Sequence, residues 1–320
     1  MRSTLADWLT LPCVVTLLAT APAIAQAPAP PAPPASRAPA GAADRITILY
    51  DAFGDSTPLT KDWGFAALIE YEGRRILFDT GNDAKVFEHN VRALGIDLST
   101  IDFAVISHRH GDHTSGLSYL LRVNPRVRIY APKEAFGVFG AELPRTFYRA
   151  DDSLPSRMRY FGGVQPATIR SGTPWPGANF TWIDTLTEVA PDIFLISTVS
   201  RTPGTVELRE LSLAIRTPEG LVLVVGCSHP GIERIIEAST AIGPHVHVIA
   251  GGLHLVATPD EEIARITSAL RDQWKVDVLA PGHCTGEPAF RALARAFGDH
   301  YLFAGLGSSI ALSGASERGT

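Results

Sequence analysis

Short apolar runs alternate with amphipathic segments along the chain from Arg45 onward. The short runs are rich in β-branched and aromatic residues and are bounded by turn residues, which is typical of strands. Apolar residues spaced three or four positions apart in the longer segments predict helices. The predicted strands are Ile46–Tyr50, Ala66–Tyr71, Ile76–Asp79, Phe103–Ser107, Val127–Tyr130, Ile193–Thr198, Leu211–Arg216, Leu221–Gly226, Val246–Ala250 and Val276–Ala280. The predicted helices are Ala84–Leu94, Ser115–Val123, Gly231–Ile242, Asp260–Gln273 and Pro288–Phe297.

The order of these elements predicts an α/β fold. The opening strands follow one another closely and pair locally, whereas helices separate the later strands. We therefore expect two mixed sheets that pack together. Residues 132–180 are irregular and rich in Gly, Pro and Arg, and we interpret them as an insert that forms a lid or a substrate-binding segment.

The first 44 residues differ in composition from the rest of the chain. An apolar run, too short for the roughly 20 residues of a membrane span, ends at Ala23-Ile24-Ala25, a small-x-small cleavage pattern. We interpret residues 1–25 as a signal peptide, with an uncleaved anchor as the alternative because Asp7 weakens the positive start. Residues 26–44 are almost entirely Ala and Pro and predict an extended linker.

This division leaves residues 45–320 as one catalytic domain. If the signal peptide is cleaved, the domain is periplasmic or secreted and has no stable membrane insertion.

The overall composition narrows the class of protein. Hydrophobic residues make up 45% of the chain and the net charge is −5. This fits a globular domain and lacks the basic excess of a nucleic-acid binder, so we expect a small-molecule substrate and no nucleic acid. The 3 Cys are too few for a disulfide framework. Cys13 lies in the predicted signal peptide, whereas Cys227 and Cys284 each lie within two residues of a histidine.

Four potential metal ligands follow the predicted strand Phe103–Ser107. The segment reads His108-Arg109-His110-Gly111-Asp112-His113. Imidazole and carboxylate are common ligands of zinc and other first-row divalent ions. The first two histidines share one side of an extended turn and can bind one ion, while the aspartate and the last histidine can serve a second. The alternative is a solvated polar loop in which Asp112 or Thr114 caps the next helix.

The motif resembles the His-x-His-x-Asp-His signature of the metallo-β-lactamase fold hydrolases. An upstream element, Phe78-Asp79-Thr80-Gly81, resembles a second feature of that superfamily. Within the superfamily, residues 45–310 are similar to the dihydropterin aminobenzene-phosphate synthase-like proteins. The segments that carry this similarity are Trp63-Gly64-Phe65, Leu77-Phe78-Asp79-Thr80-Gly81, Gly226-Cys227-Ser228-His229-Pro230-Gly231-Ile232, Gly251-Gly252-Leu253-His254-Leu255 and Gly282-His283-Cys284-Thr285-Gly286.

The resemblance implies a fold and a reaction. The fold is an αββα sandwich of two mixed sheets flanked by helices, with the metal site at the edge between the sheets. The cofactors are one or two divalent ions. The expected reaction is the attack of a metal-bound hydroxide on an ester, lactone, lactam or phosphoester, with Asp112 as the proton acceptor.

The resemblance also implies the metal ligands. His229 takes the place of a histidine that the superfamily normally supplies from a Gly-His-Thr turn, and it completes the first metal site. The last ligand of the second site is contested between His254 and His283, because different branches place it after different strands. The implied ligands are His108, His110 and His229 for one ion, and Asp112, His113 and His254 or His283 for the other.

The residues around these ligands carry further expectations. Cys227 stands where the superfamily has a metal-bridging aspartate; a thiolate there favours zinc over manganese or iron, and a buried apolar thiol is the alternative. Asp79 is expected to orient a ligating histidine or to cap a turn, and Cys284 to lie near the ions. His245 and His247 alternate within one predicted strand and are expected to be structural.

Two other functions stay open. The similarity to synthase-like proteins allows a transferase that joins a pterin to an aminobenzene ribosyl phosphate, although that pathway is intracellular and a signal peptide argues against it. Cys227 and Cys284 near the ions also allow a metal- or redox-responsive binding protein, in which a disulfide displaces an ion.

Overall fold

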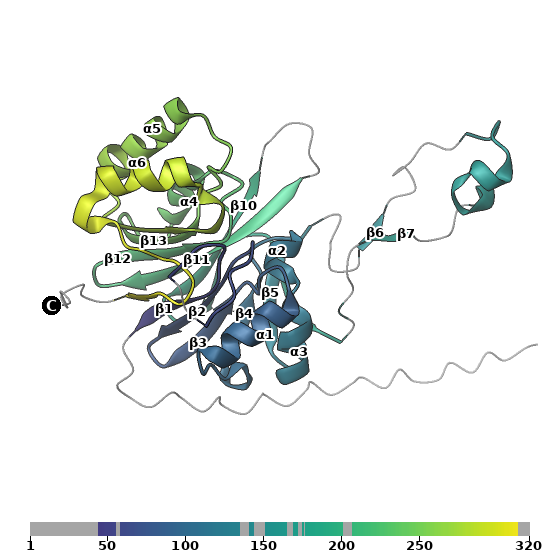
Figure 1. Ribbon diagram of the computed structural model, residues 1–320, viewed down its shortest axis with the longest axis horizontal. Helices are drawn as coiled ribbons and strands as arrows, with labels where there is room; N and C mark the ends of the chain where they lie inside the picture. Colours follow the sequence, from purple (N-terminus) through teal and green to yellow (C-terminus); the bar gives the residue numbers. More distant parts are fainter. Residues whose placement is uncertain are drawn as a thin grey trace, which may run out of the picture. The chain divides into compact units, whose positions relative to one another are not determined.

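The computed structural model describes residues 44–55, 58–134, 141–143, 151–164, 169–171, 175, 177–200 and 207–312. Their strands form two large mixed sheets and a small two-stranded sheet (Figure 1). The predicted signal peptide, and the predicted linker except for Asp44, lie outside the described residues.

The first large sheet has seven strands in the order β15-β1-β2-β3-β4-β5-β8. The strands from β15 to β3 pair antiparallel, and those from β3 to β8 pair parallel. The parallel part brings the carboxyl ends of β3 and β4 to one edge. The strands are β1 (Arg45–Tyr50), β2 (Ala66–Tyr71), β3 (Arg74–Phe78), β4 (Phe103–Val105), β5 (Arg128–Pro132), β8 (Asn179–Ile183) and β15 (Ser309–Ala311).

The second large sheet has six strands in the order β14-β13-β12-β11-β10-β9. β12, β13 and β14 are parallel neighbours, and the other pairs are antiparallel. The carboxyl ends of the three parallel strands therefore share one edge. The strands are β9 (Thr187–Ala190), β10 (Ile193–Ser200), β11 (Leu208–Thr217), β12 (Gly220–Val225), β13 (Val246–Gly252) and β14 (Val278–Gly282).

Helices cover the outer face of each large sheet (Figure 1). The α-helices are α1 (Ala84–Ala93), α2 (Gly111–Thr114), α3 (Leu117–Val123), α4 (Ile232–Ser239), α5 (Asp260–Ser268) and α6 (Glu287–Phe297). Short 3₁₀ segments occur at Leu98–Thr100, Ser156–Met158, Tyr160–Gly163, His283–Thr285 and Gly298–His300. None of the helices among the described residues is long and apolar enough to cross a membrane.

Strand alternation produces three apolar cores and hence four layers. In β12, Val222 and Val224 point into the core between the two sheets, whereas Leu221 and Leu223 point into the core under α4, α5 and α6. A third core lies between the first sheet and helices α1 and α3, and includes Phe87. The fold is therefore an αββα sandwich, which confirms the expected fold class.

The predicted elements are present with shifted ends, and five strands were not predicted. β8, β9 and β15 are short and mostly half-exposed, so their sequences lack a clear apolar alternation. The predicted helix over Asp260–Gln273 is α-helical only to Ser268 and then forms a π-helical turn, Ala269–Gln273. Within residues 132–180, β6 (Ala141–Leu143) pairs with β7 (Ile169–Ser171), and a lid role for this segment stays a prediction.

Candidate metal centre

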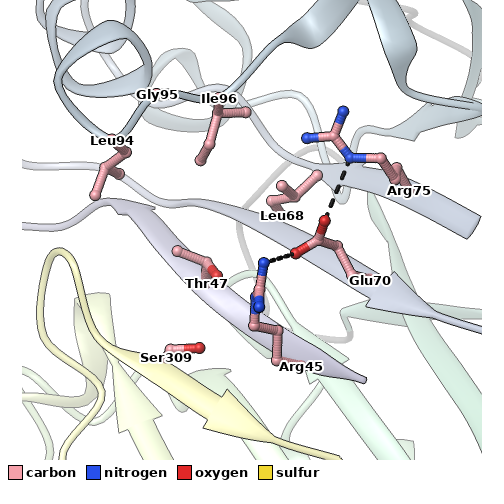
Figure 2. A pocket seen from close by; sticks show the side chains of 9 residues that line it. All are labelled: Arg45, Thr47, Leu68, Glu70, Arg75, Leu94, Gly95, Ile96 and Ser309. Carbon is pink, nitrogen blue, oxygen red and sulfur yellow. Dashed lines mark ion pairs between the residues drawn. The ribbon is translucent and has the colours of Figure 1, made fainter. Parts of the chain in front are cut away.

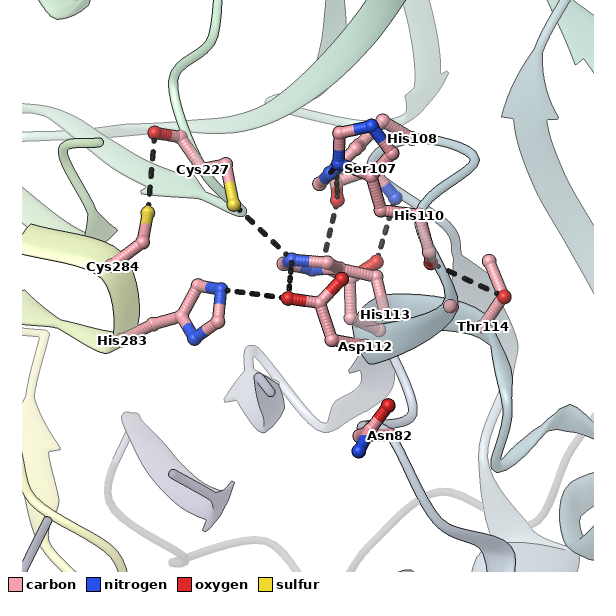
Figure 3. Close-up of polar contacts among 12 residues, drawn as sticks. Asn82, Ser107, His108, His110, Asp112, His113, Thr114, Cys227, His283 and Cys284 are labelled. Atoms are coloured by element: carbon pink, nitrogen blue, oxygen red, sulfur yellow. Dashed lines mark hydrogen bonds and ion pairs between the residues drawn. The ribbon is translucent and has the colours of Figure 1, made fainter. Parts of the chain in front are cut away.

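The candidate ligands lie where the carboxyl ends of parallel strands from both sheets face each other (Figure 3). The loop after β4 carries the motif that begins at His108, and Asp79 directly follows β3. The loops after the parallel strands of the second sheet carry the other candidates. These are Cys227 and His229 after β12, His254 after β13, and His283 and Cys284 after β14.

The two sheets approach closely at this edge because of Ser107 and Gly226. The backbone N–H of Leu211, on β11, donates a hydrogen bond to the carbonyl oxygen of Ser107 at 2.8 Å. A Cβ atom on Gly226 would lie 2.3 Å from Ser107 Oγ. Only glycine therefore allows the end of β12 to pack against the loop after β4.

His108, His110 and His229 form the first group of candidate ligands. His110 Nδ1 lies 3.1 Å from His108 Nε2 and 3.1 Å from His229 Nε2. Burial and the neighbouring histidines lower the pKa of His108 well below its usual value, and burial together with His254 lowers the pKa of His229 to about 3. Neutral imidazoles whose ring nitrogens converge in this way fit a divalent cation.

Asp112, His113 and His283 form the second group. His283 Nε2 lies 3.4 Å and His113 Nε2 3.7 Å from Asp112 Oδ2. His283 is buried, and neither of its ring nitrogens has a hydrogen-bond partner in the part of the chain that the structure describes. Buried polar atoms are nearly always partnered, so these nitrogens fit a metal ligand.

Cys227 lies between the two groups. Its Sγ atom is 3.2 Å from His113 Nε2, and Figure 3 shows it pointing toward that ring. Three sets of potential ligand atoms, each within 4.8 Å of one another, all include Cys227. The sets are His108–Cys227–His229, His113–Cys227–His283 and Cys227–His254–Cys284.

Asp79 contacts the Nδ1 side of the His113 ring, whereas Cys227 lies on the Nε2 side. Its Oδ2 accepts hydrogen bonds from His113 Nδ1 and Ser107 Oγ, and its Oδ1 accepts one from the backbone N–H of Ser107, each at 2.7 Å. A carboxylate can only accept, so the Nδ1 atom of His113 carries the proton and Nε2 is directed toward Cys227.

Two further buried carboxylates hold the ligand loops, and sequence reasoning missed both. Glu210 accepts hydrogen bonds from the backbone N–H groups of Cys227, Ser228 and His229 at 2.9, 2.7 and 2.8 Å. Burial raises the pKa of Glu210 to about 6 although these three donors oppose it. Asp51 accepts from the backbone N–H of His283 at 2.9 Å, and burial raises its pKa to about 8.

The sequence contained one signal for these carboxylates. Glu210 directly precedes the predicted strand Leu211–Arg216, and Asp51 directly follows the predicted strand Ile46–Tyr50. A charged residue in such a position is rarely buried unless it is paired or hydrogen-bonded, which points to a local task for each.

Backbone strain also concentrates at this edge. Asp79, Ser228, His254 and His283 have φ angles of 58°, 63°, 53° and 47°. Non-glycine residues rarely adopt this left-handed region, and those that do cluster at functional sites. The alternative interpretation of the motif as a helix cap is not supported, because α2 begins after His110 with no side-chain capping bond.

Apart from the candidate ligands, a hollow lies between the start of β1, β2 and the end of α1 (Figure 2). Glu70 is paired there with Arg45 at 2.5 Å and with Arg75 at 3.4 Å. Its lining contains no histidine or cysteine. This hollow therefore offers no metal-ligand set, and its one carboxylate is paired with both arginines of the lining.

Comparison with known proteins agrees with this geometry. Residues 74–182 match the family model of the beta-lactamase superfamily domain. A 7,8-dihydropterin-6-methyl-4-(beta-D-ribofuranosyl)-aminobenzene-5'-phosphate synthase from Methanocaldococcus jannaschii is 31% identical over 269 residues, which cover 77% of this chain and 90% of that protein. The chain belongs to the metallo-β-lactamase superfamily.

Two further proteins extend the similarity. The crystal structure of Tm1679, described as a metal-dependent hydrolase of the beta-lactamase superfamily, has a TM-score of 0.64 and 27% identity, and covers 85% of this chain and 100% of its own. Ribonuclease Z from Clostridium beijerinckii is 38% identical, but over only 76 residues, 24% of each protein.

The structure brings most of the predicted ligands together at one edge. The structure groups His283, rather than His254, with His113 and Asp112. His254 instead lies beside the two cysteines, with its ring centroid 4.1 Å from that of His229. The roles of all these residues as metal ligands stay predictions.

His245 and His247 lie apart from the candidate ligands of this metallo-β-lactamase fold. Both hydrogen-bond Asp277 Oδ2, at 2.7 and 2.9 Å. They belong to none of the three sets of ligand atoms, which agrees with the structural role expected for them.

Proposed function

We propose that the chain is a metal-dependent hydrolase of a small molecule that carries an ester, lactone, lactam or phosphoester bond. One observation carries this proposal: two histidine-rich groups converge at one edge of the sandwich, and the ring nitrogens of the buried His283 have no hydrogen-bond partner among the described residues. The superfamily membership supports the same reaction class.

Zinc is the ion that we propose for this site, because imidazole and thiolate together favour it over manganese or iron. Divalent ions held there would polarise the scissile bond and lower the pKa of a water molecule. The proposed ligands are His108, His110 and His229 for one ion, and Asp112, His113 and His283 for the other, with Cys227 between them.

Asp112 is the residue that we propose as the proton acceptor. Its side chain is 20% exposed, whereas those of His113 and His283 are fully buried, so Asp112 faces the opening of the site. Burial opposes ionisation, but the nearby imidazoles of His283 and His113 lower the pKa of Asp112 below its usual value. An ionised carboxylate at the opening can take a proton while water attacks the substrate.

We further propose that the domain acts in the periplasm or after secretion. The support is the sequence of residues 1–25 alone. N-terminal sequencing of the protein from a fractionated culture tests this: a mature chain that begins near residue 26 is expected, and an intact N-terminus in the cytoplasm contradicts it.

The hydrolase proposal is tested on purified protein by metal analysis and a panel of chromogenic esters, lactones, lactams and phosphoesters. We expect His110→Ala and Asp112→Ala to lose at least about 100-fold in kcat/KM on the active substrate. His247→Ala is the matched control, because this histidine belongs to the separate Asp277 cluster. Full activity in His110→Ala, or zinc-free protein that remains fully active, contradicts the proposal.

A synthase is the second candidate function, and the similarity to the Methanocaldococcus jannaschii protein favours it. Chromatography detects whether the purified chain forms the product for which that relative is named. Product formation that requires His110, together with an inactive hydrolase panel, would replace the first proposal.

A further inference from the structure

Cys227, Cys284 and His254 form a set of potential ligands that the proposed hydrolysis does not use as a unit. Their donor atoms lie within 4.8 Å of one another, with both thiols buried and His254 exposed. The two cysteines are unpaired, and the Cys284 thiol donates to the carbonyl oxygen of Cys227 at 3.7 Å (Figure 3). No step of the proposed reaction requires Cys284 or His254.

These residues come from three neighbouring strand ends of one sheet. β12, β13 and β14 run parallel, and Gly252 pairs with Gly282 in their register. Each of the three ligands lies two residues beyond the end of its own strand. Because the carboxyl ends of parallel strands meet at the same edge, the six-stranded sheet alone assembles this set. The two histidine groups, by contrast, need both sheets.

Gly252 supplies the space for the second thiol. A Cβ atom on this residue would lie 2.9 Å from Cys284 Sγ and 2.4 Å from the carbonyl oxygen of Gly226. A side chain there would displace Cys284 from Cys227. The glycine thus permits the close approach of the two thiols.

The donor set differs chemically from the two histidine groups. Two thiolates are soft ligands that, together with one imidazole, select zinc and similar ions, whereas a set of imidazole and carboxylate groups also accepts harder ions. We propose that Cys227, Cys284 and His254 form a third metal position, selective for thiophilic divalent ions such as zinc and cadmium.

Because Cys227 is shared, metal binding at the third position affects the two histidine groups. Cys227 belongs to all three sets, so an ion in the third position draws its thiolate toward Cys284 and away from the histidine groups. That consequence for activity rests on the proposed function. The metal position itself does not, because it is a statement about binding.

Cadmium NMR of the full chain tests the proposal without any substitution. The chemical shift of bound cadmium moves downfield with each thiolate ligand, so a cadmium ion bound by two thiolates has a resonance distinct from one bound by a single thiolate. We expect a two-thiolate resonance in the wild-type chain. A saturated protein that shows only resonances with one thiolate or none overturns the proposal.

Cys284→Ser provides the second test, with His247→Ala as the control, because His247 belongs to the separate Asp277 cluster. When cadmium is titrated in, the cadmium–thiolate absorbance of Cys284→Ser should reach about half of the wild-type amplitude, because one of two thiolates is removed. The variant should also bind one equivalent of cadmium less than wild type. His247→Ala should titrate like wild type. A Cys284→Ser variant with wild-type absorbance and stoichiometry overturns the proposal.

The outcome is separable from that of the hydrolase proposal. A chain that shows the two-thiolate resonance but hydrolyses nothing keeps the third position and loses the reaction. A chain that hydrolyses a substrate but lacks the two-thiolate resonance keeps the hydrolase proposal and loses the third position.

Discussion

Asp79→Asn isolates the part that a hydrogen-bonded carboxylate plays in metal binding. Asparagine keeps the size of the side chain and tolerates the left-handed backbone at this residue, where φ is 58°. It replaces one acceptor oxygen by an NH₂ group. If the NH₂ group takes the place of Oδ2, two donors face each other at His113 Nδ1, where the wild type has a 2.7 Å hydrogen bond.

The structure gives the size of the expected effect. To accept a hydrogen bond at Nδ1, His113 must move its proton to Nε2, the atom that lies 3.2 Å from Cys227 Sγ. The ring then presents a proton where a metal ligand needs a lone pair. Loss of such a supporting carboxylate costs about 10–100-fold in metal affinity, or roughly 1.4–2.7 kcal/mol. The mispaired hydrogen bond should lower the free energy of unfolding of the metal-free protein by about 1–3 kcal/mol.

Competition between the protein and a chromophoric chelator measures the zinc affinity, and urea unfolding measures the stability. Asp97→Asn is the matched control. Asp97 also accepts hydrogen bonds from a serine N–H and hydroxyl, at 2.8 and 2.6 Å, but on an exposed 3₁₀ helix. Its variant should bind zinc like wild type, because asparagine caps a helix about as well as aspartate. Unchanged zinc affinity in Asp79→Asn would refute the orienting role of this residue.

Three further predictions follow from the same edge of the sandwich. Glu210→Ala leaves three buried N–H groups without their acceptor, so urea unfolding should show a loss of at least about 3 kcal/mol; a loss below 1 kcal/mol would contradict the anchoring role. Gly226→Ala places a Cβ atom 2.3 Å from Ser107 Oγ and should cost about 1–3 kcal/mol by overpacking, together with bound metal; wild-type metal content and melting temperature would contradict it. Chelation should lower the melting temperature, and zinc at about 100 times its Kd should restore roughly 2.7 kcal/mol; a melting temperature insensitive to zinc would contradict metal binding to the folded state.

The sequence predicted the layers of the fold because alternation directly records burial. β12 shows this, since its successive apolar residues divide between two cores. The motif that begins at His108 was equally readable, because its potential ligands are close together in the sequence. Strands β8, β9 and β15 were missed because they are held by neighbours in the sheet rather than by a buried face of their own.

The partner of Asp112 was not readable from the sequence. His254 and His283 both follow parallel strands and glycines, so their sequence contexts are nearly equivalent. What separates them is the packing of the second sheet on the first, which brings the end of β14 opposite the loop after β4. Glu210 was missed for a related reason, because its partners are backbone atoms that lie 17 to 19 residues further along the chain.

The three buried carboxylates connect the fold to the site through strained backbone. Each accepts a hydrogen bond from a backbone N–H in a ligand loop: Asp79 from Ser107, Glu210 from Ser228, and Asp51 from His283. Asp79, Ser228 and His283 themselves adopt left-handed φ angles, which cost about 1–3 kcal/mol each and persist only where the surroundings impose them. The three side chains supply that constraint, because breaking their hydrogen bonds would leave buried donors and acceptors unsatisfied. These hydrogen bonds therefore fix the ligand loops before any ion binds, and the ligand positions follow from the packing of the two sheets.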